Sequence, residues 1–244
     1  METDLSQLPL MADKEPIETV VAEYDETDAP EYLAKMTNIA QRYRHIRRVR
    51  GDGACYWRCF LIALLEKCAK EPTYIQKVRD LCAEYTKILP TVGIDNMIAE
   101  DFIETFTTEL LDKVEAGNVE GALNSVKDNQ YNLYFISFLK LITAGYVLSN
   151  SEDYEINAQA EGFESLQKYV DSRIQVMETP AEDVAITASA RVFGLNIRIE
   201  YVTRDNRPMD QKGSYYLLPN DDETANYETF LLWRPEHYDL LYKD

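Results

Sequence analysis

Cys55 stands where a glycine-bearing loop meets the start of an apolar helix. Gly51 and Gly53 flank Asp52 just before it, and glycine permits a positive φ or a close approach of the backbone. Beyond Cys55 the apolar residues recur at helical spacing, which predicts a helix over residues 55–70. The first turn of a helix favours a thiolate, and its free N–H groups can stabilise an oxyanion. The position therefore suits a nucleophile, although a small cysteine packed at a helix start would show the same pattern.

His237 and Asp239 supply the other groups that could do chemistry, in a strand predicted over residues 237–243. Because side chains alternate across a strand, the two lie on one face, so the carboxylate can orient the imidazole. A cysteine, a histidine and a carboxylate arranged in this way can carry out acyl transfer, with the histidine moving the proton. The alternative is a histidine that only forms hydrogen bonds in an exposed strand. The other histidine, His45, lies in an arginine-rich stretch and is expected at the surface.

Helical patterns fill most of the chain between these groups. Asp28 can cap a helix that runs to about Tyr43. Thr179 and Glu182 can form a capping box for a helix that ends at Gly194. Apolar periodicity predicts the other helices, over residues 73–89, 97–116, 129–148 and 163–177.

Strand patterns are concentrated after this helical region. Apolar and polar residues begin to alternate at Leu195, directly after the glycine that ends the last helix. We therefore expect an α+β fold in which a large helical lobe, about residues 90–178, packs against a small and mainly antiparallel sheet. The predicted strands cover residues 195–201, 214–218, 229–233 and 237–243.

Composition and length indicate one globular domain. The chain has 244 residues, of which 45% are apolar, and this is enough to bury a substantial core. We expect a single domain over residues 21–244, preceded by a flexible acidic tail over residues 1–20, where periodicity is weak. The sequence contains no apolar run of about 18 residues and no basic and apolar leader, so we expect neither a membrane span nor secretion through a signal peptide.

Charge and cysteine usage narrow the class of partner and the compartment. The formal net charge of −18 argues against nucleic acid, which needs basic patches, and is compatible with a basic protein partner. Reduced thiols are expected, in the cytoplasm and also in the nucleus. Neither a CxxC pair nor a zinc-finger spacing is present, so no metal site is predicted from the four cysteines, Cys55, Cys59, Cys68 and Cys82.

The residues around Cys55 and His237 form two recognisable boxes. Gly51–Phe60 reads Gly-Asp-Gly-Ala-Cys-Tyr-Trp-Arg-Cys-Phe, and Arg234–Tyr242 reads Arg-Pro-Glu-His-Tyr-Asp-Leu-Leu-Tyr. These boxes resemble the cysteine box and the terminal histidine box of the otubains, which are ovarian-tumour (OTU) deubiquitinases. The resemblance covers about residues 24–243. Three further segments also resemble otubain sequence, namely Tyr43–Arg48, Leu141–Tyr146 and Asp183–Tyr201.

The resemblance implies a papain-like cysteine peptidase fold with an added helical lobe. By position, Cys55 matches the nucleophile, His237 the general base and acid, and Asp239 the residue that orients the histidine. Asp52 matches the aspartate that helps to hold the oxyanion loop. The backbone N–H groups of the oxyanion hole would come from Gly53, Ala54 and Cys55.

The resemblance also implies an activity and its partners. The activity is hydrolysis of isopeptide bonds at the C-terminal Gly-Gly of ubiquitin, without a cofactor. The implied partners are ubiquitin and polyubiquitin chains, and a ubiquitin-conjugating enzyme is a further one. We expect the protein to be a monomer and to bind neither nucleic acid nor a membrane. A narrow cleft would suit the slender tail of ubiquitin, and the residues expected to contact the substrate there are Trp57, Trp233 and Glu236.

Four residues depart from the family pattern, and none of the changes removes a catalytic atom. Ala54 replaces the usual asparagine, Tyr56-Trp57 replaces Phe-Tyr, and Glu236 replaces a glycine found in some members. Two other functions stay open at this stage. One is a catalytically dormant otubain that binds ubiquitin or a ubiquitin-conjugating enzyme, which the intact cysteine, histidine and aspartate argue against. The other is a general cysteine peptidase, which would leave the otubain-like middle segments unexplained.

Overall fold

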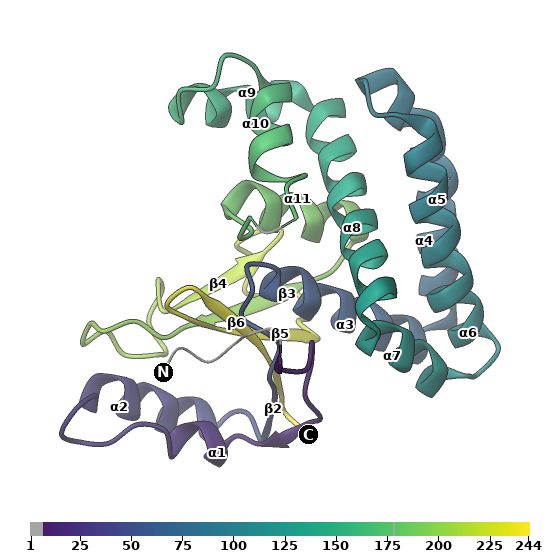
Figure 1. Ribbon diagram of the computed structural model, residues 1–244. Coiled ribbons are helices and arrows are strands. Elements are labelled where there is room, and N and C mark those ends of the chain that lie inside the picture. Colours follow the sequence, from purple (N-terminus) through teal and green to yellow (C-terminus); the bar gives the residue numbers. More distant parts are fainter. Residues whose placement is uncertain (1–6, 178) are drawn as a thin grey trace. The chain divides into compact units, whose positions relative to one another are not determined.

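The strand that carries His237 and Asp239 lies inside a six-stranded sheet (Figure 1). The structure is a computed structural model, and it describes residues 7–177 and 179–244. The described chain divides into two units, one made of the residues up to Cys59 together with Leu195–Asp244, and the other of Phe60–Gly194. The sheet belongs to the first unit. The second unit is helical and longer than the lobe predicted over residues 90–178.

The sheet is built from β1 (Glu15–Pro16), β2 (His45–Arg47), β3 (Ile197–Tyr201), β4 (Tyr215–Leu218), β5 (Thr229–Arg234) and β6 (His237–Tyr242). The strand order is β1-β2-β6-β5-β3-β4. Neighbouring strands are antiparallel except for β3 and β5, which run parallel. The sheet is therefore mixed, and two N-terminal strands extend it beyond the C-terminal strands expected from the sequence.

The two strands β5 and β6 are neighbours and are buried along most of their length. The sequence of β5 is almost continuously apolar, and five of the six residues of β6 are buried. Such runs are typical of strands covered on both faces. Their antiparallel register places Arg234 opposite His237 and Leu232 opposite Asp239. This register decides which side chains surround Asp239.

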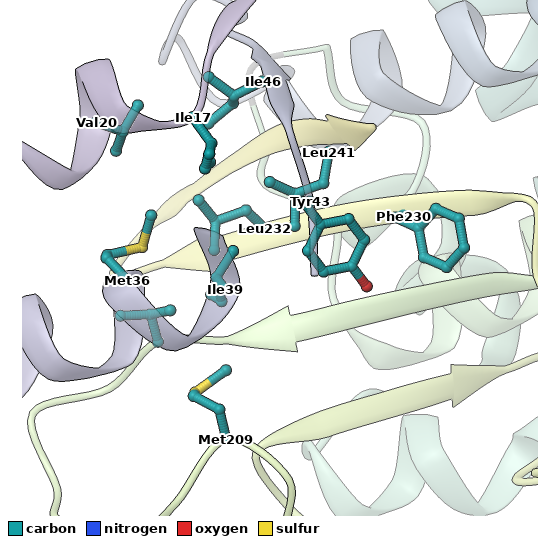
Figure 2. Packing of buried hydrophobic residues seen from close by; sticks show 11 residues of the cluster. Ile17, Val20, Met36, Ile39, Tyr43, Ile46, Met209, Phe230, Leu232 and Leu241 are labelled. Atoms are coloured by element: carbon teal, nitrogen blue, oxygen red, sulfur yellow. The ribbon is translucent and has the colours of Figure 1, made fainter. Parts of the chain in front are cut away.

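Two helices of the first unit, α1 (Glu18–Val21) and α2 (Pro30–Ala40), share a buried apolar cluster with the sheet (Figure 2). Leu232 and Leu241 come from the strands, and each such side chain stabilises the fold by roughly 1.5–3 kcal/mol when fully buried. Leu241 lies on the same strand face as the catalytic candidates of β6, because residues two apart share a face. The helical segments contribute Ile17, Val20, Met36 and Ile39.

The segment that begins at residue 7 is not a flexible tail. The two-residue strand β1 pairs with β2, and Ile17 and Val20 are completely buried. The expectation of a flexible acidic tail over residues 1–20 is therefore wrong for residues 7–20, while residues 1–6 lie outside the described residues. A strand of two residues and a helix of four are too short to show a periodic pattern, which is why the sequence did not indicate them.

The helices of the second unit are the remainder of α3 (Cys55–Lys70), α4 (Pro72–Ile88), η2 (Leu89–Val92), α5 (Asn96–Phe106), η3 (Thr107–Leu111), α6 (Asp112–Glu115), α7 (Val119–Lys127), α8 (Asn129–Ser149), α9 (Ser151–Ala160), α10 (Leu166–Arg173) and α11 (Asp183–Phe193). Most of the side chains of α8 in its second half are buried, as its apolar sequence predicts. The helices α5, α7 and α11 pack against it. The core of this unit therefore forms around α8.

Among the described residues, α8 is also the one helix that is long and apolar enough to cross a membrane by length and composition. Of its most apolar stretch, 67% is buried inside the protein. The central helix of a packed core has the same length and composition, so these properties alone do not indicate a membrane span.

Several helix boundaries confirm the sequence signals. The helix α3 begins at Cys55 and ends at Lys70, the limits predicted from periodicity. Gly194 ends α11 in the left-handed conformation, with φ of 66°, which glycine adopts without strain. The helix predicted over residues 97–116 is present as α5, the π-helical segment η3 and α6 in succession.

Two predicted helix caps are wrong. The N-cap of α2 is Ala29 rather than Asp28; Asp28 lies in a preceding turn, in which its N–H donates to the Asp25 carboxylate. The N-cap of α11 is Glu182 rather than Thr179. The capping-box pattern was present in the sequence, but the chain stays non-helical up to Glu182.

Candidate active site

Cys55 is the first residue of α3 and is 4% exposed. The loop before it turns at Gly53, which has φ of 82°, a conformation that residues with a Cβ rarely adopt. Cys55 therefore lies at the N-terminal end of the helix, where backbone N–H groups lack intrahelical acceptors.

Asp52 holds this loop by binding two arginines. Arg58, one turn into α3, donates from both terminal nitrogens to the carboxylate at 2.5 and 2.7 Å, and Arg50 donates from Nε at 2.8 Å. The N–H of Ala54 also donates to it, at 3.2 Å. Burial alone would raise the pKa of Asp52, but these hydrogen bonds, first those from Arg58, lower it. The ionised carboxylate thus fixes the backbone that leads into Cys55.

Arg58 was not expected from the sequence as part of the site. Its side chain is only 5% exposed, and it also donates to the carbonyl oxygen of Arg50 at 2.9 Å. One guanidinium therefore binds the loop at both a side chain and the backbone. A signal was available, since residues three apart on a helix are neighbours, so Arg58 had to lie beside Cys55.

His237 is the first residue of β6 and links Asp239 to Cys55. Its Nε2 lies 2.9 Å from Oδ1 of Asp239, and the imidazole is also hydrogen-bonded to the Cys55 side chain. Burial alone would lower the pKa of His237, but the hydrogen bonds to Asp239 and Cys55 raise it from 6.5 to about 9. The ring is therefore mostly an imidazolium at neutral pH, and it lies against the sulfur.

Asp239 is completely buried. Besides His237, its Oδ1 accepts the N–H of Val49 at 3.1 Å, and its Oδ2 accepts from Arg234 at 2.7 Å. Burial alone would raise the pKa of Asp239, but the hydrogen bond and charge of His237, with the charge of Arg234, lower it. Asp239 is therefore a buried carboxylate with each oxygen occupied, which is the arrangement that fixes the orientation of an imidazole.

Arg234 is a second residue of the site that was not expected from the sequence. The register of β5 and β6 places it opposite His237 and therefore against Asp239. Its other terminal nitrogen donates to Glu23 at 3.2 Å and to the Tyr24 hydroxyl at 3.3 Å. The two-residue turn between the strands was the available signal, because such a turn fixes which residues pair.

Gly51 lies directly against the imidazole. A Cβ at Gly51 would stand 3.2 Å from Nδ1 of His237 and 3.6 Å from Cε1. The first of these distances is shorter than ordinary van der Waals contact, so a larger side chain would displace the ring. At Gly51 glycine is favoured because the backbone lies close to the His237 ring, whereas at Gly53 it is favoured because φ is positive.

The oxyanion hole stays a prediction. Of its three expected N–H groups, that of Ala54 already donates to Asp52. The other two belong to Gly53 and Cys55, at the point where the loop joins α3. A helix start offers N–H groups toward an anion, so an oxyanion formed on a substrate of Cys55 would be stabilised there.

The three residues expected to contact the substrate differ in exposure. Trp57 is 1% exposed and packs edge-on against Tyr56, with ring centroids 5.5 Å apart, so the prediction of a substrate contact is wrong. A large apolar ring gains more by core burial than at the surface. Trp233 is half-buried and stacks on Tyr201, with centroids 4.6 Å apart. Glu236 is exposed, with φ of 64°, in the turn between β5 and β6. Contacts of these last two with a substrate stay predictions.

All four cysteines are buried and free of disulfides. Burial raises the pKa of Cys59 and raises those of Cys68 and Cys82 to about 12. Cys55 differs from them in that its side chain contacts an imidazole. In residues 7–177 and 179–244, no group of three or more His, Cys, Asp and Glu side chains is placed to hold a metal ion.

Comparison with known proteins identifies the family. The model of the family described as Peptidase C65 Otubain matches residues 3–243. A protein of Caenorhabditis elegans named ubiquitin thioesterase otubain-like is 31% identical over 245 residues, which cover 100% of this chain and 84% of that protein. Ubiquitin thioesterase OTUB1 of Homo sapiens is 28% identical over 238 residues, which cover 97% of this chain and 84% of that protein.

A solved structure with the same fold supports the match. The structure of a complex of ceOTUB1 with ubiquitin aldehyde and UBC13~Ub matches with a TM-score of 0.92 at 31% identity, covering 99% of this chain and 96% of that chain. The α+β otubain fold and the otubain resemblance predicted from the sequence are confirmed. The chain therefore belongs to the peptidase C65 otubain family and is a cysteine-type deubiquitinase.

Proposed function

We propose that the protein hydrolyses isopeptide bonds at the C-terminal Gly-Gly of ubiquitin, in conjugates or chains, with Cys55 as nucleophile. The observation that carries this proposal is the placement of one imidazole, which is hydrogen-bonded both to the Cys55 side chain and to the buried carboxylate of Asp239. Nucleophile, acid–base group and orienting group are thus in contact in the order that thiol catalysis requires.

In the first half of the reaction, the Cys55 thiolate attacks the carbonyl carbon of the terminal glycine. A C–S bond forms, and the C=O electron pair moves to the oxygen, which the N–H groups at the start of α3 stabilise. The intermediate then collapses and the C–N bond breaks, while the His237 imidazolium gives its proton to the leaving lysine amine. Ubiquitin is left as a thioester on Cys55.

In the second half, His237 is neutral and acts as a base. It takes a proton from a water molecule as the oxygen attacks the thioester carbonyl. The C–S bond breaks and the ubiquitin carboxyl group is released, which restores the thiolate and the imidazolium. Asp239 keeps the ring oriented through both steps, and Asp52 keeps the loop in place through Arg58.

The partners follow from the relatives. The matched solved structures contain ubiquitin aldehyde with UBC13~Ub or with UBCH5B~Ub. By this relationship the protein binds ubiquitin, polyubiquitin chains and a ubiquitin-conjugating enzyme. A cytoplasmic location is part of the same proposal, and the free cysteines are consistent with it.

A second function is favoured by the same complexes, in which a relative is bound to a ubiquitin-conjugating enzyme that carries ubiquitin. The protein would then act as a binding regulator of such an enzyme, without turnover. The two functions make different demands on Cys55, because binding does not need its sulfur and hydrolysis does. A general cysteine peptidase would need the sulfur but not ubiquitin.

The decisive experiment is labelling with ubiquitin that carries an electrophile at its C-terminus, followed by intact mass. We expect wild type to gain the mass of one ubiquitin and Cys55→Ala to gain none. Cys59→Ala is the matched control, since Cys59 lies one turn along α3 and is buried, and it should label like wild type. Binding of ubiquitin without labelling would favour the regulator. Cleavage of unfolded peptides without ubiquitin dependence would favour the general peptidase.

A further inference from the structure

A cationic pocket lies on the first unit, away from the catalytic residues. It is a cavity of about 450 Å³ lined by Arg42, Tyr43, Arg198 and Lys243. Lys243 directly follows β6 and is six residues beyond His237, which is roughly 20 Å at the rise of an extended chain. Three positive side chains thus gather at one place on a chain whose formal net charge is −18.

One buried carboxylate binds three of the residues that line this pocket. Glu200 on β3 is completely buried. It accepts from both terminal nitrogens of Arg42 at 2.6 and 3.2 Å, from Nε of Arg198 at 2.8 Å and from the Tyr43 hydroxyl at 2.7 Å. Because Glu200 supplies one negative charge against three positive ones, the lining keeps a formal charge of about +2.

The positive groups also keep hydrogen-bond donors that the protein does not use. Lys243 is exposed, and its ammonium lies over the Phe230 ring, 4.3 Å from the centroid. The Arg198 guanidinium lies over the Tyr215 ring at 3.9 Å and donates only from Nε. In the described parts of the chain, neither the Lys243 ammonium nor the terminal nitrogens of Arg198 meet an acceptor, and Nε of Arg42 is buried without one.

Two groups next to the lining residues have other partners. Glu223 accepts the Tyr215 hydroxyl at 2.8 Å, and the backbone oxygen of Asp244 lies 2.8 Å from Nδ1 of His45. The aromatic floor, in which Tyr43 and Phe230 lie 5.3 Å apart (Figure 2), holds the two arginine-bearing segments in place. The two arginines are therefore held in place by Glu200, whereas Lys243 is exposed beside them.

We propose that this pocket binds a phosphate monoester. A single carboxylate would leave one charge unmatched, whereas a phosphate monoester carries about −1.5 to −2 charges at neutral pH and three acceptor oxygens. Guanidinium groups bind phosphate oxygens in pairs, and an ammonium adds a point charge. The cavity of about 450 Å³ also accommodates the substituent of the ester. The phosphate belongs either to a small free metabolite or to a phosphorylated side chain, and both present the same group.

The test is titration with phenyl phosphate, inorganic phosphate and a phosphoserine peptide at low salt, followed by calorimetry. Lys243→Gln removes a charge that forms no ion pair within the described residues, and we expect it to weaken phenyl phosphate binding about tenfold. The matched control is Lys212→Gln, which removes an equally exposed lysine of the same unit, one that pairs with Asp221, and should leave binding unchanged.

The possible outcomes distinguish a phosphate site from no site, and a small phosphate from a phosphorylated polypeptide. Absence of phosphate binding to wild type, or equal weakening by both variants, would overturn the site. If inorganic phosphate binds as tightly as a phosphoserine peptide, the site takes small phosphates; tighter binding of the peptide identifies a phosphorylated polypeptide. Ubiquitin labelling of Cys55 should be the same in Lys243→Gln as in wild type, so this result is independent of the catalytic proposal.

Discussion

Two carboxylates on the same sheet, Asp239 and Glu200, are both completely buried and both bound by two positive groups. Glu200 is held by Arg42 and Arg198, whose charges do not titrate in the accessible range. Asp239 is held by Arg234 and by a histidine, and that histidine also contacts a thiol. The two carboxylates differ in one partner, because only Asp239 binds a group, the His237 imidazole, that can lose its proton. This difference separates a carboxylate that holds structure from one that supports catalysis in the proposed mechanism.

The largest expected effect comes from removing the charge at each carboxylate. Asp239→Asn should lower the rate of ubiquitin labelling on the order of 10³-fold, because the imidazole loses its orientation and its charge partner. Glu200→Gln should leave that rate within about twofold but lower the free energy of unfolding by about 2–3 kcal/mol, since two guanidinium groups lose their partner. Labelling kinetics and urea unfolding check both. Equal loss of labelling in the two variants would break the comparison.

The pH profile should show the same difference. The pKa of His237 is raised to about 9, so the imidazolium is complete below pH 6.5 and is lost as the pH rises through about 9. Labelling in wild type should therefore decline on the alkaline side near pH 9. In Asp239→Asn that decline should move to lower pH, because the hydrogen bond and charge that raise the pKa are weakened. In Glu200→Gln it should not move, and a shift there would contradict the proposed roles.

Arg234→Met tests the permanent charge beside Asp239. We expect labelling to slow about tenfold, because the carboxylate keeps His237 and Val49 but loses its second cation. The matched control is Arg79→Met, since Arg79 also binds two carboxylates but does so in the helical unit. A rate unchanged from wild type would show that Arg234 serves folding alone.

Gly51→Ala tests how closely the loop must approach the ring. The new methyl group would stand 3.2 Å from Nδ1 of His237, so the imidazole must shift by a few tenths of an ångström and its alignment with Cys55 is disturbed. Labelling should slow several-fold, by roughly 1 kcal/mol in activation free energy, with the pH profile kept. The unfolding free energy, measured in urea, should change less than the activation free energy.

The smallest effect is expected at Glu236, whose φ of 64° strains a residue that has a Cβ. Glu236→Gly should raise the unfolding free energy by about 0.5 kcal/mol. The substitution relieves the backbone strain, but part of this gain is offset because glycine loses more conformational entropy on folding. Glu236→Ala is the control, because it removes the same charge but keeps the strain. If both variants gain equally, the carboxylate rather than the backbone is responsible.

The residues that carry chemistry could be predicted because their signals are local. Gly53, Cys55 and the apolar run beyond it indicate a loop and a helix within a few turns of chain, and the spacing of His237 and Asp239 indicates one strand face. These are short-range patterns with known periods. The otubain fold was predicted from the resemblance of the two boxes and of three further segments in the same order.

The partners of the arginines between Arg42 and Arg50 could not be assigned from local patterns. The stretch from Arg42 to Arg50 appeared to be one basic patch, but β2 and the turns beside it send its members to different partners. Arg42 binds Glu200, Arg48 binds Glu15 and Arg50 binds Asp52. Each of these pairs depends on tertiary contacts between segments or on the exact geometry of a turn. Neither of these produces a periodic pattern that can be recognised in a single sequence.

The first unit is discontinuous along the chain, and this has a consequence for folding. Its N-terminal part ends at Cys59 and it resumes only at Leu195, so the whole of Phe60–Gly194 is synthesised in between. Contacts of such long sequence separation form late, because a long loop must close first. The helical unit can thus fold on the ribosome before His237 has been synthesised. Cys55 then lacks its histidine partner, and the newly made protein is inactive until β6 inserts between β2 and β5.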